Sequence, residues 1–183
     1  MSRPVVLVLA SGRGERFIAS GGVGPKLQAL LDGRPILEHT LEAVRASGLP
    51  WHLEDVGHDG MGDSIAAAVR ATPNAAGWLI LPGDLPLLQP ETLQAVAEAL
   101  ARSAVVAPHY RGERGHPVGF SASCGEALAA LKGGQGAAPV MRAQAAIGAV
   151  ASLELDDPGI VTDIDTLDEL ARVERILQAR PRP

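Results

Sequence analysis

The seven residues PVVLVLA, Pro4 to Ala10, constrain the fold of this chain more than any other stretch. They lack the polar alternation of a half-exposed strand, so they are typical of a strand that is buried on both faces. WLILPGD (Trp78 to Asp84) and AVVAP (Ala104 to Pro108) repeat this pattern, and VASLEL (Val150 to Leu155) is a less apolar fourth candidate. Such strands are found in parallel sheets that helices cover on each side.

Amphipathic helical patterns separate the predicted strands. Residues 35–47 and 90–103 each carry an apolar stripe at helical spacing, and residues 166–179 begin with Thr166 and Glu169 at the spacing of a capping box. Strands that alternate with such helices predict an α/β fold, here a three-layer sandwich with a mostly parallel sheet. Ligands bind such sheets beyond the carboxyl ends of the strands.

Composition narrows the classes of function. The 183 residues fit one domain, which we place at residues 1–179 with a tail at 180–183. A net charge of −5 argues against a nucleic-acid partner. Cys124 is the only cysteine, and the first apolar run is too short for a signal peptide or a membrane span. We therefore expect a cytoplasmic protein with no membrane partner.

The segment LASGRGERFIASGGVGPKL, Leu9 to Leu27, follows the first predicted strand. A dinucleotide-binding loop is rejected, because Phe17 stands where a third glycine must follow Gly12 and Gly14. A Walker loop is rejected as well, because no Ser or Thr follows Lys26. A solvated surface loop and a phosphate clamp of another type remain open.

The clamp interpretation rests on small residues and cations. The serine and glycines of this segment let backbone N–H groups approach phosphate oxygens. Arg16 and Lys26 would then close on a triphosphate from either side, with Arg13 nearby. Sites of phosphoryl and nucleotidyl transfer depend on such positioning and charge neutralisation.

Five motifs along the chain support this interpretation through a resemblance. They occur in the order LVLASGRGERF…GPKL, GMGDSIAAAV, LPGDLPLLQPETL, RGHPVGF and DDPGIVTDIDTLDEL, and extend from Leu7 to Leu170. The set resembles the GT-A-like nucleotidyltransferases that build molybdenum-cofactor dinucleotides, and it is most similar to the molybdenum cofactor cytidylyltransferases. The resemblance implies a Rossmann-like sheet of the GT-A type.

The resemblance also implies roles for individual residues. Arg16, Lys26 and Asp84 would be catalytic, and Asp84 and Asp165 would hold Mg²⁺. Arg114 and His116 would meet an anionic acceptor. The implied nucleotide-binding residues are Ala10, Ser11, Gly12, Arg13, Gly14, Gly62, Ser64, Pro82 and Gly83.

The same residues allow plainer interpretations. Asp84 follows a strand in a Gly- and Pro-containing turn, where aspartate often bonds its own backbone. Asp163 and Asp165 share a face if extended, but acids are also ordinary before a helix. Asp63 or Ser64 would serve as a helix N-cap.

The implied reaction is Mg²⁺-dependent transfer of CMP from CTP to the terminal phosphate of molybdopterin, with release of pyrophosphate. Transient contact with a molybdoenzyme or its chaperone is a further expectation. The alternatives are a guanylyltransferase that uses GTP, a sugar-1-phosphate nucleotidyltransferase, and a non-catalytic molybdopterin-binding protein of the same fold.

Three features depart from the family pattern. FIASGGVG lengthens the gap between Arg16 and Lys26, and we expect this stretch to be flexible or to fold only around nucleotide. Leu167 replaces a proline, which would loosen the start of the last helix. Residues 47–60 have room for one short strand at 51–55 where the family has a further strand and helix, so the sheet would be shortened in the middle.

Overall fold

The first apolar run forms the strand β1 (Val5–Leu9). In the computed structural model, which describes residues 3–179, Leu7 and Leu9 join the core on one face of the sheet. Val6 and Val8 join the core on the other face. The run is therefore buried on both sides, as predicted, and the tail predicted at 180–183 lies outside the described residues.

The central sheet has seven strands in the order β4-β1-β5-β8-β6-β7, with β9 also paired to β6. Their bounds are β4 (Trp51–Glu54), β5 (Gly77–Pro82), β6 (Val105–Tyr110), β7 (Glu113–Arg114), β8 (Val118–Ser121) and β9 (Val150–Glu154). β1 is parallel to β4 and β5, and β6 is parallel to β9. β8 runs antiparallel between β5 and β6. The predicted mostly parallel sheet is confirmed.

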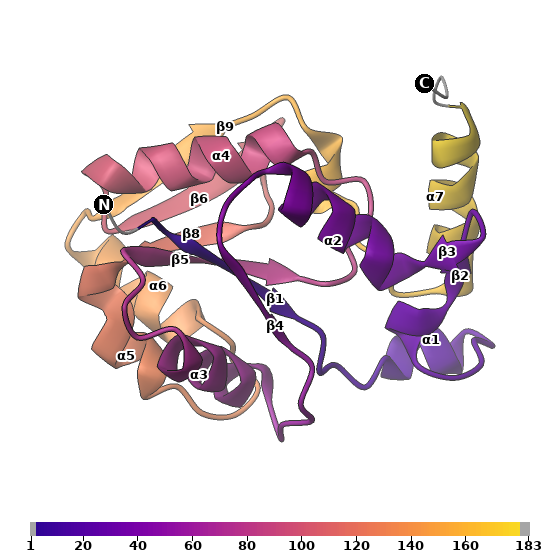
Figure 1. Cartoon of the computed structure of the whole chain (residues 1–183), viewed down its shortest axis with the longest axis horizontal. Coiled ribbons are helices and arrows are strands. Elements are labelled where there is room, and N and C mark those ends of the chain that lie inside the picture. The colour runs from indigo at the N-terminus through magenta and orange to yellow at the C-terminus, as the bar shows by residue number, and fades with distance from the viewer. Residues whose placement is uncertain (1–2, 180–183) are drawn as a thin grey trace.

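Helices cover both faces of this sheet (Figure 1). The helices α3 (Met61–Ala71), α5 (Gly125–Ala129) and α6 (Ala138–Ala146) contribute Ile65, Leu128 and Val140 to the first core. The helices α2 (Ile36–Ala46) and α4 (Pro90–Ala99) contribute Val44 and Val96 to the second. The three-layer α/β sandwich is confirmed.

A smaller group of elements lies beside the sandwich at the side of α2 (Figure 1). It consists of α1 (Glu15–Ala19), the hairpin of β2 (Leu30–Leu31) and β3 (Arg34–Pro35), and α7 (Leu167–Ala179). A third core holds part of this group together, with Leu31 from the hairpin and Val173 from α7 packed with Ile164. The group therefore joins an early part of the sequence, residues 15–35, to the last helix, α7.

The elements predicted from apolar patterns are present, with small shifts of their ends. The helix predicted at 90–103 continues after Ala99 as a 3₁₀ turn, Leu100–Arg102. β4 is the single short strand predicted at 51–55, and within residues 3–179 it pairs only with β1. The hairpin β2–β3, the strands β7 and β8 and the helices α5 and α6 are additions that the patterns did not predict.

A carboxylate from a distant segment supports the start of α4. Asp157 is buried, and its side chain accepts hydrogen bonds from Gln89 N (3.0 Å), Thr92 Oγ1 (2.7 Å) and Gly159 N (2.8 Å). The first turn of a helix has N–H groups without a helical partner. Asp157 thereby joins α4 to the turn that leads toward α7.

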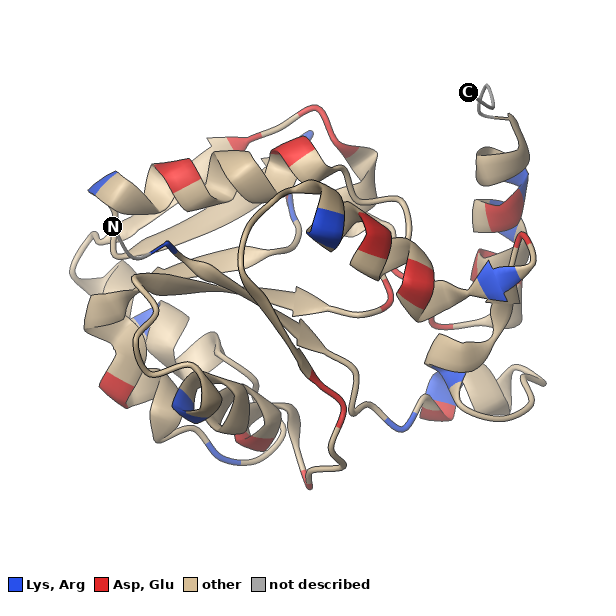
Figure 2. Cartoon of the chain, in the orientation of Figure 1, with Lys and Arg blue, Asp and Glu red and all other residues tan. Residues whose placement is uncertain are grey.

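Figure 2 shows acidic and basic residues interspersed on α2 and α7. Within residues 3–179, no helix has both the length and the apolar character needed to cross a bilayer.

Candidate active site

Gly14 allows the two ends of the first loop to meet. Its φ of 62° lies in the left-handed region, which favours glycine. A Cβ at this position would lie 2.9 Å from Lys26 Cβ, closer than packed carbon atoms tolerate. The glycine therefore lets the strand-to-helix turn after β1 lie directly against the segment that carries Lys26.

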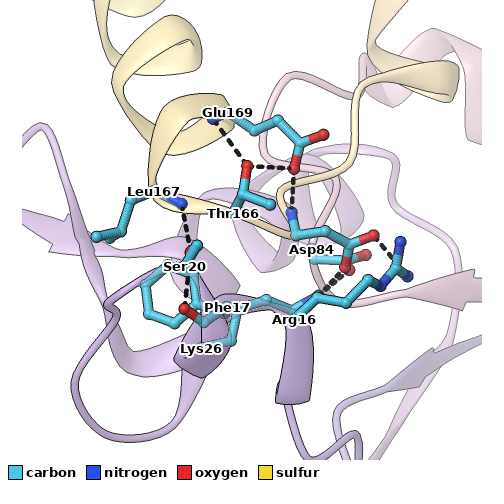
Figure 3. Close-up of polar contacts among 9 residues, drawn as sticks. Arg16, Phe17, Ser20, Lys26, Asp84, Thr166, Leu167 and Glu169 are labelled. Atoms are coloured by element: carbon cyan, nitrogen blue, oxygen red, sulfur yellow. Dashed lines mark hydrogen bonds and ion pairs between the residues drawn. The ribbon is translucent and has the colours of Figure 1, made fainter.

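Lys26 lies between two of the predicted metal ligands. Its Nζ is 2.7 Å from Asp84 Oδ2 and 2.8 Å from Asp165 Oδ1. Arg16 reaches the same cluster from α1, with Nη2 2.6 Å from Asp165 Oδ2 (Figure 3). The structure thus brings together four residues that come from three separate parts of the sequence.

Burial and charge shift the pKa values in this cluster. Burial acts to lower the pKa of Lys26, but the carboxylates of Asp84 and Asp165 outweigh it and raise that pKa. Burial acts to raise the pKa of Asp165. The hydrogen bond from Lys26 and the positive charges of Lys26 and Arg16 outweigh burial and lower that pKa. Lys26 is therefore an ammonium and Asp165 a carboxylate at neutral pH.

Backbone contacts fix the position of Asp84 at the end of β5. Thr40, buried on the apolar face of α2, donates from Oγ1 to Gly83 O at 2.9 Å. Ile164 N donates to Asp84 O at 3.2 Å, which joins the turn after β5 to the segment that carries Asp165. The role of Thr40 was not predicted, because its place in an apolar helical stripe suggested only packing.

Three carboxylates converge beside the loop. Asp84, Asp163 and Asp165 each offer an oxygen, and these atoms all lie within 4.8 Å of one another. Partial burial raises the pKa of Asp163, and the charges of Asp84 and Asp165 contribute to this rise. Within residues 3–179, Asp84 Oδ1 is buried without a hydrogen-bond partner. A buried acceptor of this kind costs free energy unless it finds a donor or a cation.

A pocket of about 470 Å³ extends from these carboxylates along the loop after β1. Of the predicted nucleotide-binding residues, its wall includes Ser11, Gly12, Arg13, Gly14, Ser64, Pro82 and Gly83. The hydroxyls of Ser11 and Ser64 lie 2.7 Å apart, which links the loop after β1 to α3. His58 and Asp59 also line the pocket, and His58 Nε2 lies 3.0 Å from the buried Glu54 Oε1. No motif in the sequence identified these two wall residues.

Two residues predicted to contact nucleotide have backbone N–H groups that are engaged within the fold. Ala10 N donates to Glu54 O at 2.8 Å as part of the sheet, and Gly62 N donates to Gly133 O at 2.7 Å. Neither residue lines the pocket, and neither N–H is free for a phosphate or a base. Asp63 caps no helix, because its carboxylate accepts from Gly133 N at 2.9 Å. These bonds hold the first turn of α3 against a second glycine-rich turn.

A second pocket, of about 300 Å³, shares Asp84 and Asp165 with the first. Its wall includes Arg114 and His116, the two predicted acceptor contacts, together with Asp163. Burial lowers the pKa of His116, with Asp84 opposing this shift and Arg114 adding to it. His116 is therefore a neutral imidazole at neutral pH, rather than a second cation beside Arg114.

The long stretch between Arg16 and Lys26, which we expect to be flexible, is helical only in its first part. Its first part forms the end of α1, where Phe17 is buried. Lys26 begins a 3₁₀ turn, Lys26–Gln28. Val23, between them, is 92% exposed.

The comparison with protein families assigns the chain to a family. Residues 43–148, more than half of the chain, match the MobA-like NTP transferase domain. The chain belongs to this family. The resemblance seen in the sequence is confirmed at the level of this family.

Two curated proteins are similar to this chain in sequence. The purine catabolism protein PucB of Bacillus subtilis is 30% identical over 174 residues, which cover 87% of this chain and 84% of PucB. The bifunctional protein GlmU of Alkalilimnicola ehrlichii is 35% identical over 117 residues, 51% of this chain. That match spans only 25% of the length of GlmU.

Two solved structures share the fold. Rv0371c of Mycobacterium tuberculosis, in a complex with manganese, has a TM-score of 0.72 at 21% identity and covers 95% of this chain and 99% of its own. The molybdopterin-guanine dinucleotide biosynthesis protein A of Archaeoglobus fulgidus has a TM-score of 0.65 at 18% identity, over 96% of this chain and all of its own (100%). At these identities the comparison establishes the fold alone.

Proposed function

We propose that the chain transfers CMP from CTP to the terminal phosphate of molybdopterin and releases pyrophosphate. One observation supports a reaction between two substrates: the two pockets share part of their walls. Arg16, Asp84 and Asp165 line both of them. A triphosphate in the first pocket and an anionic acceptor in the second would therefore meet beside the carboxylates.

The triphosphate would lie along the loop after β1. Gly12 and Gly14 keep this part of the wall free of side chains, and Arg13 and Arg16 supply positive charge. Lys26 would exchange a carboxylate for a phosphate oxygen as the nucleotide enters. Positioned cations of this kind stabilise the charge that develops during phosphoryl transfer.

The carboxylates fit a divalent cation. Asp84 Oδ1 is buried without a partner among the described residues, and Asp165 and Asp163 offer further oxygens within 4.8 Å. Mg²⁺ prefers one or two carboxylates together with substrate phosphates, so Asp84 and Asp165 would hold it. When bound, the cation would neutralise the α- and β-phosphates. The manganese in the Rv0371c structure supports a divalent metal for this fold.

The acceptor would enter from the second pocket, past Arg114 and His116. A phosphate monoester has a second pKa near ~6, so it is largely ionised at neutral pH and needs no general base. One of its oxygens forms a bond to the α-phosphorus, the bond from the α-phosphorus to the bridging oxygen breaks, and pyrophosphate leaves. Arg114 and neutral His116 would orient the attacking phosphate as hydrogen-bond donors, and they would limit the repulsion between two polyanions.

Support for CTP comes from the segment GMGDSIAAAV and its resemblance to cytidylyltransferases. The Archaeoglobus structure, named for a guanine dinucleotide, makes GTP the second candidate. Turnover with purified molybdopterin tests both. The chain is mixed with Mg²⁺ and CTP, GTP, ATP or UTP, and pyrophosphate release is followed. Pyrophosphate release with CTP alone supports the proposal. Release with GTP alone would make GTP the substrate in place of CTP. No release with any nucleotide refutes transfer to molybdopterin.

A further inference from the structure

Ser20 joins the loop after β1 to the start of α7. Its hydroxyl donates to Phe17 O at 2.8 Å, within its own loop, and accepts from Leu167 N at 3.0 Å (Figure 3). The residues of the second bond are 147 positions apart in the sequence. The sequence predicts a loosened helix start at Leu167, but the structure shows that Ser20 satisfies the N–H that a proline would lack.

The glycines after Ser20 complete this contact. A Cβ at Gly22 would lie 2.3 Å from the ring of Phe17, so the chain turns back closely over this buried side chain. A Cβ at Gly21 would lie at contact distance, 3.5 Å, from Leu167 Cδ1. Ser20 to Gly22 therefore lies between Phe17 and Leu167, and the exposed Val23 marks where this packed part ends.

Leu167 belongs to a rigid helix start that also carries Asp165. Glu169 Oε2 accepts hydrogen bonds from Asp165 N (2.7 Å) and Thr166 Oγ1 (3.1 Å), and Thr166 Oγ1 accepts from Glu169 N (3.3 Å). This pattern is a variant of the capping box predicted for residues 166 and 169, because the backbone donor to Glu169 is Asp165 N and not Thr166 N. The position of Leu167 N is thereby fixed relative to the Asp165 carboxylate.

The α1 segment is thus bound to this helix start at two points. One is the ion pair of Arg16 and Asp165, and the other is the hydrogen bond of Ser20 and Leu167. The first point involves the carboxylate to which the proposed function gives a metal ion. A metal ion would compete for Asp165 and a triphosphate for Arg16, so both could break this ion pair. The hydrogen bond of Ser20 and Leu167 involves neither ligand.

We propose that Ser20 is a positioning residue for nucleotide binding. It fixes α1 to α7, so that Arg16 stays beside the phosphate pocket when Asp165 binds a cation and Arg16 turns to the triphosphate. This inference rests on the proposed function, because only a bound nucleotide and metal would break the ion pair.

Four variants isolate the bond between Ser20 and Leu167. Ser20→Ala removes the acceptor, and Leu167→Pro removes the donor at a first helical position that tolerates proline. Leu167→Ala is the matched control, because it shortens the side chain but keeps the N–H. The double variant Ser20→Ala/Leu167→Pro tests whether the two changes act through one bond.

The first measurement is the Kd for CTP and for GTP with Mg²⁺, by calorimetry. We expect Ser20→Ala and Leu167→Pro each to weaken binding about three- to tenfold relative to Leu167→Ala, the effect of one hydrogen bond. The double variant should bind no more weakly than the weaker of the two single variants. Equal affinity of Leu167→Pro and Leu167→Ala, or losses that multiply in the double variant, would overturn the proposal.

The second measurement needs no nucleotide. Limited trypsin digestion with mass spectrometry gives the initial rates of cleavage after Arg16, next to the buried Phe17, and after Arg13 in the exposed loop. Ser20→Ala and Leu167→Pro should raise the rate after Arg16 relative to the rate after Arg13, and Leu167→Ala should not. If the unmodified chain binds neither nucleotide, the proposed function fails, whereas unchanged cleavage after Arg16 in Ser20→Ala would refute the positioning role itself.

Discussion

Lys26 Nζ lies 2.7 Å from Asp84 Oδ2, so an ammonium group occupies the space beside a carboxylate that the proposed function assigns to a metal ion. The same nitrogen is 2.8 Å from Asp165 Oδ1. A protonated lysine and a divalent cation therefore compete for the same oxygens. Under the proposed function, the arrival of a triphosphate would resolve this competition, because it would give Lys26 another anionic partner.

This competition predicts the effect of Lys26→Met on metal binding. Without nucleotide, the variant should bind Mn²⁺ at least about tenfold more tightly than the unmodified chain, since hydrogen bonds to charged groups contribute about 1.5–3 kcal/mol. Electron paramagnetic resonance of free Mn²⁺ gives both dissociation constants. Equal constants would show that Lys26 does not obstruct the metal, and Lys26→Arg serves as a control that keeps a cation at this position.

Asp84→Ala should abolish transfer and leave the fold intact. Neutralisation of phosphate charge by a bound metal stabilises a transition state by several kcal/mol, so turnover should fall by about a thousandfold or more. Pyrophosphate release measures turnover, and circular dichroism verifies the fold. A folded variant with near-normal turnover contradicts the assignment of Asp84 as a metal ligand.

Asp157→Ala should destabilise the fold without a direct effect on the site. The substitution leaves the buried donors at Gln89 and Thr92 without their acceptor, a cost of about 3 kcal/mol in the free energy of unfolding. Urea denaturation measures this loss. The exposed neighbour Asp156 provides the control, because Asp156→Ala should change the same free energy by less than about 0.5 kcal/mol.

His116 should make stability depend on pH in the weakly acidic range. Its pKa is lowered in the fold, chiefly by burial, so the unfolded chain binds a proton more readily. Stability from this group is present above the unfolded pKa near ~6.5 and declines as the pH falls from there toward the lower folded pKa. Thermal unfolding from pH 7.5 to pH 5 should show a smaller decline for His116→Gln. An identical decline in both proteins would contradict a depressed pKa.

The sheet and its helices could be predicted because each strand carries its own pattern. The continuous apolar run of β1 and the apolar stripes of α2 and α4 indicate which residues are buried, even when the elements that pack on them are unknown. α6 escaped prediction because it is rich in alanine and buries only Val140 among its residues. β8 has four residues, one of them Gly119, and such a short strand has little local signature.

The residues that shape the site through distant contacts could not be predicted. The bonds of Thr40 to Gly83 and of Ser20 to Leu167 join segments far apart in sequence. The carboxylates Asp84 and Asp165 were found through motifs, and the structure brings them together beside Lys26. Ala10 and Gly62 were assigned from the same motifs, but their N–H groups were already committed to Glu54 and Gly133.

The antiparallel strand β8 lies between two parts of the sheet, one made of β4, β1 and β5 and the other of β6, β7 and β9. Arg114 lies on β7 and His116 in the link between β7 and β8, whereas the glycine-rich loop follows β1 and Asp84 follows β5. Substitutions on the acceptor side therefore need not disturb the strands that present the triphosphate. If the proposed function holds, the acceptor could therefore change through substitutions at Arg114 and His116, while β1, β5 and the loops that follow them stay the same.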